Sequence, residues 1–171
     1  RKGKRDEAME AFKQQVEVAP ENSSAHASLG NLYYELQRYP EAVAELEKAV
    51  ALNPQNIPDQ VNLGGAYLGA GQTDKGLAIL DQVVQDRPLP GAWNGVAFKL
   101  ASHRVKLDKA EKYAESAVAT QSIALRNAEI DHVTAVTLRM AVQLATAWDT
   151  LGWVYFQSGH ADEAAKFIKA A

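Results

Sequence analysis

Landmarks recur at a fixed interval of 34 residues along this chain of 171. Pro20, Pro54 and Pro88 keep that interval, and each follows an apolar helical run that a proline cannot continue. A small residue followed four positions later by a bulky apolar one keeps it too, at Ala8/Phe12, Ala42/Leu46, Gly76/Leu80 and, more weakly, Ala110/Ala114. A period of this length indicates stacked structural repeats, each of which buries its apolar face only against its neighbours.

Between these landmarks lies a second helical pattern. Its members are Leu29-Gly30-x-x-Tyr33, Leu63-Gly64-x-x-Tyr67, Trp93-x-x-Val96-Ala97-x-x-Leu100 and Trp148-x-x-Leu151-Gly152-x-x-Tyr155. Together with the landmarks, this pattern resembles the tetratricopeptide repeat. The resemblance implies an all-α fold, a right-handed superhelix (α-solenoid) of antiparallel helix pairs, with the first helix of each pair lining the concave side. The glycine or alanine inside the pattern would let a neighbouring backbone approach closely.

We therefore expect one solenoid over 1–171. It divides into a half repeat at 1–22, repeats at 23–56, 57–89 and 90–144, and an incomplete repeat at 145–171. Because the chain opens inside one pattern and stops inside another, we interpret it as a piece of a longer protein.

The repeat at 90–144 carries about 20 inserted residues, since the next landmark after Ala110 is Ala164. Apolar residues keep helical spacing on both sides of the insertion, and only NAEIDH (127–132) has the composition of a turn. The pattern predicts an elongated helical hairpin near 108–157, built from helices at about 108–127 and 133–157. The hairpin either pads one contact between repeats or serves as a docking arm; its alanine- and valine-rich stripe favours the first.

Composition excludes several classes of partner. The net charge is −3, the isoelectric point is near 5.8 and the basic residues are scattered, so no nucleic acid is expected. No window approaches eighteen unbroken apolar residues, so no membrane partner is expected. The chain has no cysteine, and its localisation stays undetermined.

No catalytic, metal or cofactor site is expected. His26, His103, His132 and His160 are isolated from further ligands at helical spacing. His26 occupies the position at which the repeat pattern has tryptophan, so we expect it to be packed. We expect the other three histidines to lie on the surface. The glycines of GGAYLGAG (64–71) lie inside and at the end of a helix, where packing and a turn at Gly71 explain them better than a phosphate loop. Asn22 precedes a helix and is interpreted as its N-cap rather than as a glycosylation acceptor.

What remains is a surface for recognition. A stripe one residue off the packing stripe of each first helix has no partner that the repeat demands, and by the resemblance it faces a groove that holds an extended peptide or a partner helix. The predicted partner-binding residues are Asn31, Tyr34, Asn62, Leu68, Asn94, Phe98, Trp153 and Phe156.

Asn31 and Asn62 coincide with two asparagines of the clamp by which some family members bind a C-terminal carboxylate. Ala27, Gly91 and Gly95 stand where that clamp needs lysine or arginine, so chaperone tails are disfavoured.

Trp153 and Phe156 are large aromatics off the packing stripe, which are usually covered by something. A bound partner, the hairpin folding back and a helix beyond 171 are the three alternatives. We expect a non-catalytic module that binds a protein or peptide; a structural brace or a homodimerisation module is the alternative.

A narrower resemblance covers about 90–171. WNGVAFKLA, LDKAEKYAESAV and WDTLGWVYFQSG resemble the terminal repeats of bacterial tetratricopeptide proteins, some of which follow a transglutaminase-like domain. This resemblance implies a bacterial source and an accessory role beside other domains.

Overall fold

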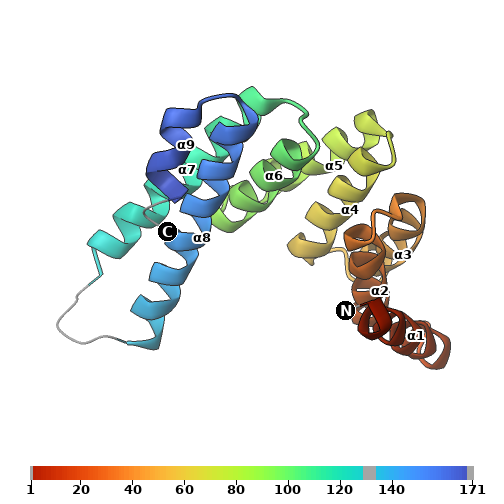
Figure 1. The fold of residues 1–171 in the computed structure, drawn as a ribbon. Coiled ribbons are helices and arrows are strands. Elements are labelled where there is room, and N and C mark those ends of the chain that lie inside the picture. Colours follow the sequence, from red (N-terminus) through yellow and green to blue (C-terminus); the bar gives the residue numbers. More distant parts are fainter. Residues whose placement is uncertain (1, 129–133, 169–171) are drawn as a thin grey trace. The chain divides into compact units, whose positions relative to one another are not determined.

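A computed structural model describes residues 2–128 and 134–168, which form nine helices and no strand (Figure 1). The predicted all-α fold class is confirmed. In chain order the helices are α1 (Lys2–Val18), α2 (Ser23–Glu35), α3 (Tyr39–Leu52), α4 (Ile57–Gly69), α5 (Thr73–Asp86), α6 (Pro90–Ser102), α7 (Leu107–Arg126), α8 (Ala135–Gln157) and α9 (Ala161–Ile168).

The helices gather into two compact units, unit 1 (Arg1–Val83) and unit 2 (Val84–Ala171). In unit 1, α2 packs against α1 and α3, and α4 packs against α3. In unit 2, α6 packs against α7 and α8, and α8 packs against α7 and α9. Sequential helices joined by short turns therefore form the antiparallel pairs that the repeat predicts.

Two glycines of the repeat pattern explain how closely the helices of unit 1 approach. A Cβ added at Gly30 would lie 2.7 Å from Leu46 Cγ, and one added at Gly64 would lie 2.7 Å from Leu80 Cγ. Real side chains do not tolerate such distances, so only glycine leaves room for the leucine. Leu46 and Leu80 are almost fully buried there, at 0% and 1% exposure. The packing role predicted for Gly64 is confirmed.

Two residues at helix ends have the structural roles that the sequence predicts. The side chain of Asn22 accepts hydrogen bonds from the backbone N–H groups of Ser24 (3.0 Å) and Ala25 (3.2 Å), which confirms the N-cap. Gly71 has a φ of +75° and ends α4 in the left-handed region, as its turn position predicts. Gln37, one repeat earlier, holds the same region at a φ of 58° without being glycine.

The elongated hairpin is confirmed. α7 has 20 residues and α8 has 23, whereas α2 has 13 and α3 has 14. The two long helices pack against each other, and their far ends extend away from α6 and α9 (Figure 1). We call this extension, residues 121–126 of α7 with 135–144 of α8, the arm. Of the predicted turn at 127–132, residues 129–132 lie outside the described residues.

Within 2–128 and 134–168, no helix combines the length and the apolar character that crossing a bilayer requires.

Candidate functional site

The predicted partner-binding residues fall into two sets. Each set lies on two helices that pack against each other, α2 with α4 in unit 1 and α6 with α8 in unit 2. The unit 1 set comprises Asn31, Tyr34, Asn62 and Leu68, and the unit 2 set comprises Asn94, Phe98, Trp153 and Phe156.

The unit 2 set displays aromatic surface. Phe98 is 44% exposed, Trp153 is 38% exposed and Phe156 is 54% exposed. Phe98 on α6 and Trp153 on α8 occupy the same repeat position, five residues after the tryptophans at 93 and 148. The rings of Trp153 and Phe156 stack with centroids 5.8 Å apart and planes 26° apart. A stacked pair loses little further rotamer freedom when it is covered, so it is suited to binding.

An unsatisfied acceptor lies beside this surface. The side-chain oxygen Oδ1 of Asn94 is buried and has no hydrogen-bond partner among the described residues. Buried polar atoms nearly always have a partner, and leaving one unpaired costs about 1–3 kcal/mol. Asn94 lies one helical turn before Phe98, and because its Oδ1 has no accessible surface, a donor on a ligand that covers Phe98 would reach it only after the Asn94 side chain rotates outward.

In unit 1, Asn31 and Asn62 are half-buried. Neither side-chain amide makes a hydrogen bond within the described part of the chain, so both keep donor and acceptor capacity. Tyr34 lies edge-on to Tyr39, with ring centroids 5.5 Å apart. Burial, and secondarily the neighbouring Tyr39, raises the pKa of Tyr34 to about 12, so its hydroxyl is protonated at neutral pH.

The structure corrects the expectation for Leu68, which was predicted to lack a partner within the chain. Leu68 is only 7% exposed, and its Cδ2 would lie 2.8 Å from a Cβ added at Gly76. Because Gly76 has no side chain, α5 approaches α4 closely enough to draw Leu68 into the helix interface. We therefore exclude Leu68 from the proposed binding surface.

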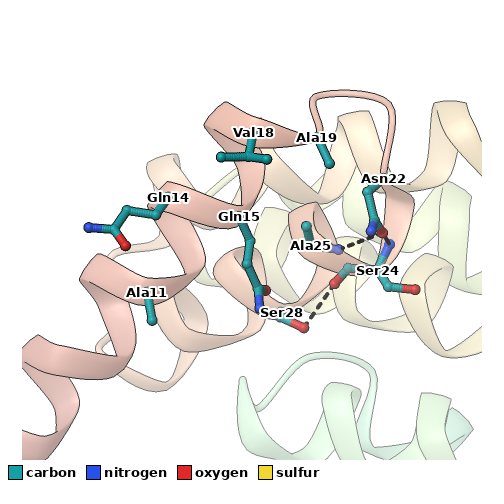
Figure 2. Close-up of a pocket in the computed structure, with 9 residues that line it drawn as sticks. All are labelled: Ala11, Gln14, Gln15, Val18, Ala19, Asn22, Ser24, Ala25 and Ser28. Atoms are coloured by element: carbon teal, nitrogen blue, oxygen red, sulfur yellow. Dashed lines mark hydrogen bonds between the residues drawn. The ribbon is translucent and has the colours of Figure 1, made fainter.

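A pocket of about 590 Å³ between α1 and α2 was not anticipated from the sequence (Figure 2). Asn22 caps α2 there, and the Ser28 hydroxyl donates to the Ser24 carbonyl at 2.8 Å, so these polar groups are already used within the chain. The only feature of the sequence that marks this pocket is a run of small and polar residues at helical spacing. The lining residues are Ala11, Gln14, Gln15, Val18, Ala19, Asn22, Ser24, Ala25 and Ser28.

His26 is a packed residue, as its repeat position predicts. It is 3% exposed, with Nδ1 2.6 Å from Glu45 Oε2 and Nε2 2.9 Å from the Pro20 carbonyl oxygen. Burial raises the pKa of Glu45, but hydrogen bonds from His26 and Lys48 outweigh it and leave the pKa below its ordinary value.

Two of the remaining histidines, His160 and His103, lie within the described residues. His160 is exposed, with Nδ1 3.2 Å from Glu111. His103 is the C-cap residue of α6 and is half-buried rather than on the surface; burial, with nearby Lys99, lowers its pKa. His132 lies outside the described residues. No cluster of three histidines or acids able to hold a metal occurs where the structure describes the chain.

Family models described as tetratricopeptide repeat match residues 1–60, 38–97 and 145–171. Residues 98–144, which contain the arm, lie outside these matches. A curated relative, the BBSome complex member BBS4 of Bos taurus, is 30% identical over 101 residues, which is 57% of this chain. The chain spans only 19% of the length of that relative.

Solved structures show the same fold. The putative kinesin light chain nearly identical TPR-like repeats of Podosopora anserina align with a TM-score of 0.64 at 21% identity, covering 99% of this chain and 85% of that chain. YrrB, described as a TPR protein with an unusual peptide-binding site, aligns with a TM-score of 0.52 at 18% identity, covering 98% of this chain and 76% of that chain. These likenesses confirm the predicted class of fold, an all-α superhelix of stacked helix pairs.

Proposed function

The chain belongs to the tetratricopeptide repeat family, and we propose that it binds a peptide or a partner helix of another protein through the first helices of its repeats. Membership of the family supports a protein–protein interaction module as the general function, because such repeats are generally non-catalytic scaffolds. The peptide-binding site named for YrrB supports a peptide-sized ligand here as well.

One observation carries this proposal. Phe98 and Trp153, on the packed helices α6 and α8, expose aromatic surface at the same repeat position, beside the unpartnered Oδ1 of Asn94. An apolar surface with a few polar groups that fix orientation is the usual composition of a peptide site. In unit 1, the side-chain amides of Asn31 and Asn62 form a separate surface that would offer hydrogen bonds to a peptide backbone. We expect micromolar affinity, about −8 kcal/mol.

The test is a pull-down that compares the native chain with a Phe98→Ala/Trp153→Ala variant. We expect a protein retained by the native chain to be lost by the double variant. Leu52→Ala is the matched control, because Leu52 is a 39%-exposed apolar residue at the end of α3, which is not one of the helices that carry Phe98 and Trp153. Equal recovery of every protein by all three chains would contradict the proposal.

The competing proposal is a structural brace or a homodimer that covers Trp153 and Phe156. The observation that favours this competing proposal is that both rings are exposed in the single chain. Size-exclusion chromatography with light scattering distinguishes the two, since a dimer that Trp153→Ala dissociates would favour the homodimer. A bacterial source and an accessory place beside other domains stay predictions.

A further inference from the structure

A continuous exposed stripe runs along α8 from the arm to the end of the helix. Successive members are separated by three or four residues, so they share one face of the helix. We call this set the α8 stripe; it consists of Leu138, Val142, Ala145, Asp149, Trp153 and Phe156. Leu138 is 60% exposed and Val142 is 58% exposed, so the arm adds two exposed apolar side chains to the two aromatic rings.

The stripe lies opposite the face by which α8 packs within unit 2. Leu144, Ala147, Leu151 and Val154 keep helical spacing on the other side of α8 and are at most 5% exposed. Those residues account for the packing of α8 against α6, α7 and α9. The α8 stripe therefore lies off the main packing face of α8, and Trp153 and Phe156 stay partly exposed rather than being covered by the arm.

Two residues of opposite charge lie at different points along the stripe. Asp149 is exposed in the stripe between Val142 and Trp153, and Arg139 is exposed on its flank ten residues earlier. Within the described residues neither forms an ion pair. On a helix, ten residues correspond to about 15 Å. A complementary surface would thus carry a cation and an anion at about that separation.

We propose that the α8 stripe binds an amphipathic helix of another protein, which carries a lysine or arginine against Asp149 and an acidic residue against Arg139. This inference rests on the proposed function and specifies its partner. From Leu138 to Phe156 the stripe extends about 27 Å, the length of a helix of about 18 residues. Apolar anchors at helical spacing are the means by which an amphipathic helix is recognised.

Charge also argues against a second copy of this chain as the occupant. The middle of the stripe is near residue 147, so Asp149 lies only about two residues from it. Two stripes in full contact would bring both Asp149 side chains to about 6 Å along the axis if antiparallel, and directly opposite if parallel. Like charges so placed repel.

The experiment uses the 171-residue chain and two synthetic helical peptides of about 20 residues. Both carry the same leucine stripe and a glutamate placed against Arg139, and they differ only in having lysine or glutamate opposite Asp149. Fluorescence anisotropy of the labelled peptides gives the dissociation constants. We expect the lysine peptide to bind about fivefold or more tightly than the glutamate peptide, because the ion pair is flanked by apolar side chains.

Three variants identify the surface. Asp149→Lys should reverse the preference between the peptides, and Leu138→Ser/Val142→Ser should weaken both by at least tenfold. Glu10→Lys is the matched control, because it reverses an exposed charge on α1 and should change neither constant. Circular dichroism shows whether each variant keeps its helices.

Two outcomes would overturn the inference. One is equal affinity for the two peptides, or a preference that Asp149→Lys leaves unchanged. The other is a dimer of the native chain in light scattering that Leu138→Ser/Val142→Ser dissociates, which would make a second copy the occupant. If the peptide experiment fails but Phe98→Ala/Trp153→Ala still loses a protein in the pull-down, only the identity of the partner is refuted. If the pull-down shows no such loss, the proposed function itself is refuted.

Discussion

The hydroxyl of Tyr155 donates a hydrogen bond to Glu115 Oε1 at 2.7 Å, and the two residues are 40 positions apart in the chain. Tyr67 donates to Glu47 in the same way across 20 positions. Each tyrosine ends a Leu-Gly-x-x-Tyr pattern, and each glutamate follows a landmark residue of the preceding helix, Leu46 or Ala114. The two bonds are therefore the same contact between consecutive repeats.

This equivalence shows where the insertion is accommodated. The 20 extra residues separate Glu115 from Tyr155, yet the contact that joins the two helices is unchanged. The insertion is taken up in the arm, while the base of α7 and α8 keeps the register of an ordinary repeat. A helical hairpin allows this because both of its helices can lengthen without altering their packing below.

Loss of the shared contact should destabilise unit 2. We expect Tyr155→Phe to lower the free energy of unfolding by about 1–2 kcal/mol, since a hydrogen bond to a carboxylate is lost. Tyr113→Phe is the control, because the hydroxyl of Tyr113 has no hydrogen-bond partner within the described residues and should change stability by less than about 0.5 kcal/mol. Urea unfolding followed by circular dichroism measures both; equal stabilities would refute the role of the bond.

The glycines beside Leu46 and Leu80 should not tolerate a side chain. Gly30→Ala and Gly64→Ala should each destabilise by about 1–3 kcal/mol through overpacking. Gly91→Ala is matched to them as a helical glycine, but a Cβ there would meet nothing within 4 Å. It should be neutral or stabilise by up to about 1 kcal/mol. Thermal denaturation would contradict this account if all three variants shifted alike.

Gln37 occupies a backbone region that favours glycine. Gln37→Gly should stabilise the chain by about 0.5–1 kcal/mol, because it removes the steric strain of a φ of 58°. Gln37→Ala keeps a Cβ and should show no such gain. In the reverse direction, Gly71→Ala should cost about 1 kcal/mol at the equivalent turn. Chemical denaturation in which Gln37→Gly and Gln37→Ala behaved identically would exclude strain at this turn.

Lys99 should make stability rise with pH in the alkaline range. It is 8% exposed, and burial lowers its pKa to about 8, whereas the unfolded chain keeps a pKa near 10.4. Between these values the unfolded state binds more protons, so raising the pH favours folding, by up to about 3 kcal/mol in total. Lys99→Met should abolish the increase and stabilise the chain at pH 7.

The measurement for Lys99 is the unfolding free energy at intervals from pH 7 to 9.5. That range stays below about pH 10, near which the tyrosines of the unfolded chain titrate; in the folded chain burial raises the pKa values of Tyr34, Tyr67 and Tyr155 to about 12. Lys112→Met on the exposed face of α7 should retain the slope of the native chain. A native chain with a flat profile in this range would be inconsistent with a buried lysine.

Glu45 should give the opposite dependence at acid pH. Its pKa is lower in the folded state than in the unfolded state, so its contribution is present above about pH 4.3 and is lost as the pH falls through the folded value. Glu45→Gln should destabilise the chain by about 1–3 kcal/mol at pH 7, since His26 loses a carboxylate partner. Near pH 3 the two chains should converge, while Glu35→Gln should follow the native profile throughout.

The sequence alone determined the features that arise from local chemistry. The 34-residue period, the two long helices of the hairpin, the Asn22 cap and the turn at Gly71 all follow from side-chain spacing and backbone preference within a few residues. These preferences act along the chain and can be read from neighbouring residues.

Only the tertiary structure decided which side chains stay open to a partner. Leu68 became buried because Gly76 lets α5 approach α4, and the side-chain oxygen of Asn94 is buried without a hydrogen-bond partner among the described residues. The stacking of Trp153 on Phe156 and the open stripe from Leu138 likewise depend on which face of α8 its neighbours cover. Exposure is set by the distance between one helix and its packed neighbours, which the spacing of residues within one helix does not specify.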